Sequence, residues 1–191
     1  MDNRQRTAAI IDGLLKFVLL GGTISVTLLA PNVLVALDKP LQKILKKLDA
    51  RQQERELKRV LHYMKRKQLI TTADYAHGIK VTAKGKKRAK KAVFADLRIS
   101  PPKHWDKHWR IIFFDIPESR RYARVELTRK LRSLGFRQLQ RSTWVHPFPC
   151  RQEIEAVATT YKVQRYLSYI ETSHIDNQRA LRKVFSSLLN N

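Results

Sequence analysis

The chain has 191 residues, 43% of them hydrophobic, which permits one large or two small globular domains. Its 39 Lys and Arg against 16 Asp and Glu give a formal net charge of +23, so we expect a polyanionic partner, above all nucleic acid. The single cysteine, Cys150, excludes an intrachain disulfide framework and a multi-cysteine zinc site, and it fits a reducing cytoplasm, where we expect the protein. No P-loop, dinucleotide-binding or HExxH pattern is present.

The N-terminal part contains an apolar stretch from Phe17 to Leu37 that carries no charged residue. Its length alone would permit a membrane span, and the lysines on both sides give little orientation signal. Gly21-Gly22 and Pro31-Asn32 break it, so the pattern predicts short packed helices over 7–20, 23–30 and 33–48. A membrane-associated scaffold anchored by Phe17–Leu37 stays open as the third alternative for the function.

The segment 49–70 is predicted to be a basic helix. Asp49 and Gln52 have the spacing of a capping box, and apolar residues recur at helical spacing from Leu57 to Met64. The cations lie largely outside that apolar stripe, as they do in a helix that contacts DNA. These candidate contact residues are Arg55, Lys58, Arg59, His62, Lys65 and Arg66.

Two short strands, 69–72 and 79–82, follow this helix and are predicted to form a hairpin around a turn with Asp74 and Gly78. A run of lysines and arginines comes next, and the order of helices, basic helix, hairpin and VTAKGKKR resembles a winged helix-turn-helix domain. Between Lys39 and Lys91 there are 18 Lys and Arg against four Asp and Glu, which favours phosphate contact over a merely solvated surface. This part adds Lys80, Lys84, Lys86, Lys87 and Arg88 to the candidate contacts.

Ser100-Pro101-Pro102 marks the clearest domain boundary, because consecutive prolines stiffen a connection and cannot continue a helix. We therefore predict a DNA-binding domain over 1–99, a linker over 100–108, a second domain over 109–176 and a terminal helix over 177–191. In the second domain we expect strands over 110–115, 136–140, 142–147 and 166–171. Helices are expected over 120–134, with Gly135 just beyond its end, and over 150–161.

This β-α-β-β-α-β order is the ferredoxin-like arrangement, with both helices on one face of an antiparallel sheet. The whole chain is therefore predicted to be an α+β protein. The other face of the sheet needs cover, and a homodimer would provide it.

Residues 113–148, FFDIPESRRYARVELTRKLRSLGFRQLQRSTWVHPF, resemble the core domain of the CRISPR-associated Cas-two family. They resemble still more the middle domain of PaaX-type transcriptional repressors, named for phenylacetic acid degradation. Both families have a hydrophobic strand ending in Asp, basic residues on a helix, and then Gly-Phe/Tyr-x-x-Leu/Val-Gln-x-Ser-x-Trp/Phe. The matching residues here are Asp115, Arg120, Arg121, Arg124, Gly135, Phe136, Leu139, Gln140, Ser142 and Trp144. A basic winged helix in front is similar to the PaaX-type layout, which implies a regulator that contacts duplex DNA.

Asp115 carries the alternative function. In the Cas-two family this Asp pairs with its symmetry mate to bind a divalent metal, so the resemblance implies a Mg²⁺ site at Asp115, with Glu118 able to assist. The protein would then be a metal-dependent nuclease or a CRISPR adaptation subunit. In the simpler interpretation, which we favour, Asp115 caps the loop or accepts hydrogen bonds from backbone amides and nearby arginines, and no cofactor is required. Arg120, Arg121 and Arg124 would form a secondary basic helix.

Overall fold

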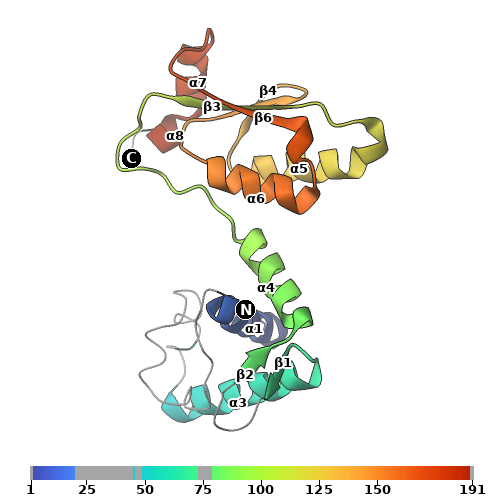
Figure 1. Ribbon diagram of the computed structural model, residues 1–191. Coiled ribbons are helices and arrows are strands. Elements are labelled where there is room, and N and C mark those ends of the chain that lie inside the picture. Colours follow the sequence, from blue (N-terminus) through green and yellow to red (C-terminus); the bar gives the residue numbers. More distant parts are fainter. Residues whose placement is uncertain (1, 20–44, 46–48, 73–78, 190–191) are drawn as a thin grey trace. The chain divides into compact units, whose positions relative to one another are not determined.

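The computed structural model describes residues 2–19, 45, 49–72 and 79–189, and they divide into two compact units, 1–96 and 97–191 (Figure 1). The predicted helices over 23–30 and 33–48, and the proposed turn with Asp74 and Gly78, lie outside the described residues except for Leu45. The same holds for the apolar stretch beyond Leu19. None of the helices in the described ranges combines the length and the apolar character that a membrane crossing requires.

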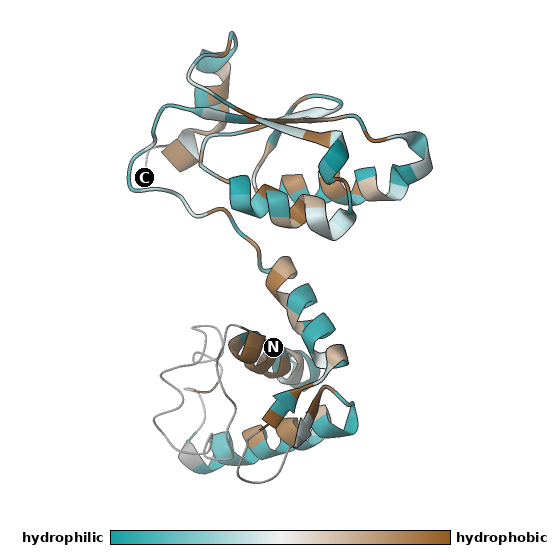
Figure 2. Cartoon of the chain, viewed as in Figure 1, coloured by the Kyte–Doolittle hydropathy of each residue, from teal (hydrophilic) through white to brown (hydrophobic). Residues whose placement is uncertain are grey.

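The N-terminal unit contains helices α1 (Asn3–Leu19), α3 (Ala50–Arg66) and α4 (Ala83–Ala95), with an antiparallel hairpin of β1 (Ile70–Thr72) and β2 (Ile79–Val81). The capping box of α3 is confirmed: the Asp49 carboxylate accepts from the Gln52 N–H at 2.8 Å, and Gln52 Oε1 accepts from the Asp49 N–H at 3.3 Å. In Figure 2, α1 is mostly hydrophobic, whereas α3 carries both hydrophobic and hydrophilic residues. The buried core joins these elements through Ile10, Ile11, Leu14, Leu15, Leu45, Leu57, Val60, Met64, Leu69, Ile70 and Ala89.

The basic run after the hairpin forms helix α4. Thr82 is its N-cap, with its hydroxyl accepting from the Gly85 N–H at 3.0 Å and donating to the Gln68 carbonyl at 2.7 Å. Residues 84–91 therefore lie on a helix that contacts α1, and they do not extend the hairpin.

The C-terminal unit has the predicted β-α-β-β-α-β order: β3 (Trp109–Phe114), α5 (Arg121–Ser133), β4 (Arg137–Gln140), β5 (Thr143–His146), α6 (Arg151–Tyr161) and β6 (Leu167–Thr172). Short turns η3 (Glu118–Arg120) and η4 (Gln164–Tyr166) precede α5 and β6. The strands pair in the order β4-β5-β3-β6, every neighbouring pair antiparallel, and Figure 1 shows α5 and α6 on the same face of this sheet. The predicted α+β class and the predicted order of strands and helices in this unit are confirmed.

Helix α5 ends as its sequence predicts. Gly135 has φ of +89°, a conformation that suits glycine, and its N–H donates to the Arg132 carbonyl. The Phe136 N–H then reaches back to the Leu131 carbonyl at 3.0 Å, which closes the helix in a Schellman motif.

The expected single terminal helix is two short helices, α7 (Gln178–Val184) and α8 (Ser186–Leu189). Figure 1 shows α7 on the sheet face opposite α5 and α6, and Leu181 and Phe185 pack with Trp109 and Val145. The chain itself therefore covers the Trp109 end of the face for which we expected cover from a second copy. Phe113 and Ile170, on the same face, remain 40% and 46% exposed.

Candidate nucleic-acid interface

The outward side of α3 carries one continuous cationic stripe. Five residues recur at alternating spacings of four and three, which places them on one side of a helix, and all five are exposed: Arg51, Arg55, Lys58, His62 and Lys65. The first and last of them lie 14 residues apart, about 21 Å along the axis. The opposite side is buried through Leu57, Val60 and Met64. The predicted split between an apolar and a basic face of this helix is therefore present, with Arg51 as a cation that our prediction left out.

Arg59 has a different role from the residues of the stripe. Its guanidinium donates to both carboxylate oxygens of Glu56, at 2.7 and 2.9 Å, and to Thr7 Oγ1 on α1 at 2.5 Å. The hydrogen bond from Arg59 lowers the pKa of Glu56, a residue only 9% exposed, and the same bond raises the pKa of Arg59. Arg59 thus joins α3 to α1 and is less free for phosphate contact than the sequence suggested.

Two further predicted DNA contacts on α3, Lys58 and Arg66, interact with neighbouring side chains. Lys58 makes an ion pair with Glu54 one turn away at 2.7 Å, with 61% of the lysine side chain exposed. The Arg66 guanidinium lies 5.8 Å from the centre of the Tyr63 ring. Exposed ion pairs of this kind contribute little energy, so a phosphate can replace Glu54 as the partner of Lys58.

The hairpin and α4 present a second group of cations. Lys80 on β2 and Lys84, Lys86 and Lys87 on α4 are exposed. Arg88 is half-buried and makes an ion pair with Asp12 on α1 at 2.7 Å, so the structure assigns it to packing. Lys90 and Lys91, which our prediction did not include, are also exposed and lie four residues beyond Lys86 and Lys87. Helical spacing within the basic run would have identified both lysines from the sequence.

Asp115 lies exposed just beyond β3 in the C-terminal unit. Its backbone N–H donates to the Tyr166 carbonyl at 3.0 Å, while its carboxylate has no hydrogen bond or ion pair to any described residue. The expected support from nearby arginines is therefore wrong. Arg124 binds Glu118 at 2.6 Å, Arg121 lies 3.8 Å from Glu118, and Arg120 donates to the Lys162 carbonyl at 3.0 Å.

Within the part of one chain that the structure describes, Asp115 is not grouped with enough carboxylates for a divalent-metal site. Mg²⁺ takes several oxygen ligands in a near-octahedral arrangement. Glu118, the one candidate helper, is bound to Arg124, and the hydrogen bond from Arg124 lowers the pKa of Glu118. Among the described residues, no three histidine, cysteine or acidic side chains gather as a metal site would require.

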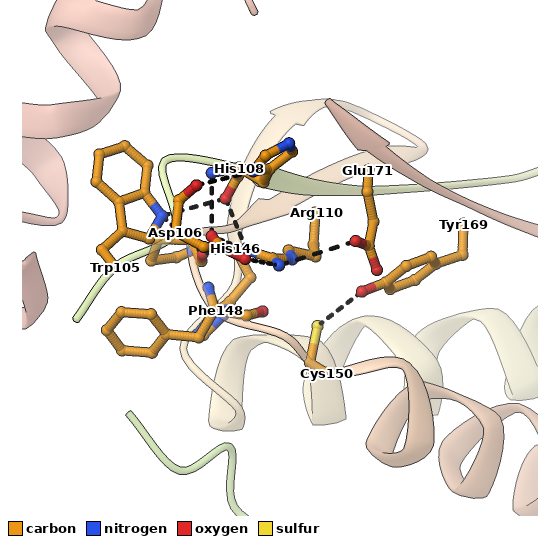
Figure 3. Close-up of polar contacts among 10 residues, drawn as sticks. Trp105, Asp106, His108, Arg110, His146, Phe148, Cys150, Tyr169 and Glu171 are labelled. Atoms are coloured by element: carbon orange, nitrogen blue, oxygen red, sulfur yellow. Dashed lines mark hydrogen bonds and ion pairs between the residues drawn. The ribbon is translucent and has the colours of Figure 1, made fainter. Parts of the chain in front are cut away.

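A buried polar network holds the start of β3 (Figure 3). Arg110 is 3% exposed; its guanidinium pairs with Asp106 and donates to the His108 and Pro147 carbonyls, each at 2.8 Å. The Trp105 indole N–H donates to the same Pro147 carbonyl at 2.9 Å. Residues 105–108, predicted as linker, are thereby fastened to the sheet.

His146 and Cys150 sit beside this network, and both are buried (Figure 3). Burial lowers the pKa of His146 to about 4, and His146 Nδ1 accepts from the Phe148 N–H at 3.1 Å. Burial also raises the pKa of Cys150 to about 12, so its thiol is protonated and unreactive at neutral pH. The described geometry therefore gives His146 and Cys150 a structural role. His104 and His108 are exposed.

Comparison with known proteins identifies a known domain in the C-terminal unit. No curated protein matches the chain. Residues 102–184 match the family model described as the PaaX protein central Cas2-like domain, which covers the entire β-α-β-β-α-β sheet and α7. The resemblance inferred from Asp115, Gly135 and Trp144 is thus confirmed over residues 102–184. The C-terminal unit therefore contains a domain that matches the central Cas2-like domain of the PaaX protein.

Proposed function

We propose that this protein is a PaaX-type transcriptional regulator that binds duplex DNA through its N-terminal unit, acting as a repressor. The observation that carries the proposal is the stripe of Arg51, Arg55, Lys58, His62 and Lys65 on α3. A helix with one buried and one cationic side can enter a major groove, and a following hairpin can contact the backbone beside it. The order α3, β1, β2 supports the interpretation of this unit as a winged helix.

The cations outside α3 support the same partner. Lys80 on the hairpin and Lys84, Lys86 and Lys87 on α4 would contact phosphates, and Arg120 and Arg121 offer a secondary contact on the C-terminal unit. We further propose that the protein acts as a homodimer through its Cas2-like domain, because dimeric regulators read two half-sites at once.

The test is a gel-shift titration of the full chain with Arg55, Lys58 and Lys65 replaced together by alanine. We expect the affinity for duplex DNA to fall at least about a hundredfold, since each lost phosphate contact removes counterion release. Arg59 is left intact, because removing it would also break the contacts to Glu56 and Thr7. A matched control replaces three exposed cations of the C-terminal unit, Lys103, Arg179 and Lys183. An equal loss of DNA affinity in both triple variants would contradict the assignment of the DNA contacts to α3.

The alternative, a metal-dependent nuclease, has one observation in its favour: the Asp115 carboxylate is exposed and has no partner among the described residues. A second copy would have to supply the remaining ligands. Incubation of the protein with RNA and DNA across several divalent metals tests it. Cleavage by the wild type that Asp115→Asn abolishes would establish the nuclease, and absence of cleavage in all conditions would remove it.

A further inference from the structure

One arginine on the flank of α3 is held in a single orientation by two helices. The Arg59 Nε and Nη2 atoms donate to the two carboxylate oxygens of Glu56, and Nη2 also donates to Thr7 Oγ1 on α1 at 2.5 Å. The Thr7 hydroxyl gives its own hydrogen to the Asn3 carbonyl at 2.9 Å, so its oxygen is left as an acceptor for Arg59. Arg59 is therefore anchored to both α3 and α1, whereas an exposed arginine ordinarily samples many rotamers.

These anchors leave one part of the Arg59 guanidinium open. A guanidinium has five N–H donors, and Glu56 and Thr7 together take three of them, at Nε and Nη2. Nη1 carries the other two and has no hydrogen-bond partner among the residues that the structure describes, and 54% of the Arg59 side chain is exposed. Nη1 can thus meet an acceptor from solvent while the anchored atoms stay bound to the protein.

The carboxylate that anchors Arg59 is shielded from solvent and faces a second cation. The Glu56 side chain is only 11% exposed, and Arg6 Nε on α1 lies 3.8 Å from Glu56 Oε1. Arg6 Nε is buried and makes no hydrogen bond to any described residue. Two arginines therefore share one buried carboxylate, so this cluster keeps a net positive charge and presents it to solvent largely through Arg59.

The position of Arg59 on α3 indicates what the open Nη1 would meet. Four exposed basic residues recur at spacings of four, three and four, which places them along one side of a helix: Arg55, Arg59, His62 and Arg66. This row shares Arg55 and His62 with the cationic stripe, and Arg59 lies on its α1 side because it contacts Thr7. When a helix lies in a major groove, side chains on its flank meet the sugar-phosphate backbone, whereas central ones reach the base edges.

We propose that Glu56 positions Arg59 for a contact between Nη1 and a phosphate of duplex DNA on the α1 side of α3. This inference rests on the proposed function and deepens it by giving an acidic residue a part in binding a polyanion. An arginine that is already fixed in its binding orientation loses less conformational freedom when it meets a phosphate. Its two free N–H groups can then make charge-assisted hydrogen bonds to phosphate oxygens.

Glu54 on the same helix provides the contrast. It pairs with Lys58 at 2.7 Å, but both side chains of this pair are exposed. A flexible lysine gains little orientation from an exposed ion pair, so Glu54 acts on DNA mainly through its own charge. Loss of one negative charge is therefore expected to have opposite effects on DNA affinity at positions 54 and 56.

Fluorescence anisotropy of the full chain with a labelled random-sequence duplex tests this contrast. Glu54→Gln should bind about two- to threefold more tightly, because its repulsion of the phosphates is lost. Glu56→Gln should bind about three- to fivefold more weakly, because one amide oxygen cannot hold both Nε and Nη2 of Arg59. Thermal melting followed by circular dichroism checks that both variants are folded. A folded Glu56→Gln that binds as tightly as the wild type, or more tightly, overturns the proposal.

A second variant tests the positioning of Arg59 without changing any charge. Thr7→Val removes the acceptor on α1 and should weaken DNA binding about twofold, because Arg59 loses one anchor. Thr160→Val is the matched control: Thr160 makes the same hydroxyl bond to the carbonyl four residues before it, at 2.8 Å, but lies on α6 and should not affect binding.

The effect of Thr7→Val must pass through Arg59. In an Arg59→Lys background, which keeps the charge but cannot make the three anchoring bonds, Thr7→Val should cause no further loss of DNA affinity. An equal loss in both backgrounds would show that Thr7 acts on the fold of the unit and would overturn the positioning role.

These measurements separate the inference from the proposed function. If the α3 triple variant loses DNA binding while Glu56→Gln changes the affinity as Glu54→Gln does, the regulator stands and the role of Glu56 fails. A wild type without affinity for duplex DNA removes both.

Discussion

Buried polar residues decide how the first strand of the Cas2-like domain is held. Arg110 is almost fully buried on a strand whose neighbours are apolar, and its charge is compensated by Asp106 and by two backbone carbonyls. The hydrogen bond from Arg110 lowers the pKa of Asp106, and the same bond raises the pKa of Arg110. Loss of either partner would leave a buried charge uncompensated, which costs several kcal/mol.

His146 gives the C-terminal unit a pH-dependent stability. Its pKa is about 4 in the folded state against an ordinary value of 6.5, so below pH 6.5 the unfolded chain binds a proton that the folded chain does not. We expect the free energy of unfolding to fall by about 3 kcal/mol between pH 6.5 and pH 4, and this contribution to level off below pH 4.

Urea unfolding followed by tryptophan fluorescence measures this effect, because all three tryptophans lie in residues 97–191. The comparison variant is His146→Gln, which keeps an acceptor for the Phe148 N–H but cannot titrate. Carboxylates titrate in both proteins. The difference between the two proteins in the slope of unfolding free energy against pH therefore isolates the contribution of His146. An unchanged slope in His146→Gln would contradict the assignment.

At the scale of the elements, Gly85 lets α4 pack directly on the hairpin. A Cβ at this position would overlap the Leu69 carbonyl oxygen and lie 2.6 Å from Val81 Cγ1. Since the oxygen belongs to the backbone, α4 could accept a side chain only by moving away from β1 and β2, which would disturb the Thr82 cap.

We therefore expect Gly85→Ala to destabilise the N-terminal unit by about 1–3 kcal/mol, despite the higher helix propensity of alanine. Urea unfolding followed by circular dichroism measures it. Lys84→Ala, at an exposed position of the same turn, is the control and should change stability by less than about 0.5 kcal/mol. Equal stability of Gly85→Ala and the wild type would show that α4 does not need this close approach.

The helices also show which features can be predicted from residues that are close together in the sequence. Asp49 and Gln52 predicted the start of α3, and Gly135 the end of α5, because caps involve residues close in sequence. The basic run after Thr82 was harder to assign, since lysines suit a solvated loop and a solvated helix equally well. Packing of Gly85 and Ala89 against the rest of the unit makes it a helix.

At the scale of the whole molecule, positive charge is spread over both units. Residues 1–96 carry 21 Lys and Arg against eight acidic residues, and residues 97–191 carry 18 against eight. Net charge alone therefore does not say which unit would contact DNA in the proposed function. What distinguishes the N-terminal unit is the alignment of its cations along one helix.

Salt dependence measures how many of these charges contact phosphate. The logarithm of the DNA-binding constant should fall linearly with the logarithm of the salt concentration, with a slope of about −0.9 for each neutralised phosphate. Removing Arg55, Lys58 and Lys65 should make the slope less steep by about 2–3, whereas the triple variant of Lys103, Arg179 and Lys183 should leave it unchanged. A slope that stays the same in the α3 variant would mean that these residues do not contact phosphate.

The sequence by itself determined the α+β class, the order of the strands and helices in the Cas2-like domain, the basic face of α3 and the resemblance to PaaX-type proteins. These follow from hydrophobic periodicity, capping residues and a motif, all of which are local in the chain. Only the tertiary structure decided that Arg59 and Arg88 bind Glu56 and Asp12, that Asp115 has no arginine partner, that α7 covers part of the sheet, and that β6 is an open edge. Each of these depends on which residues distant in sequence become neighbours, because charge compensation, sheet cover and strand pairing are properties of contacts that the folded chain creates.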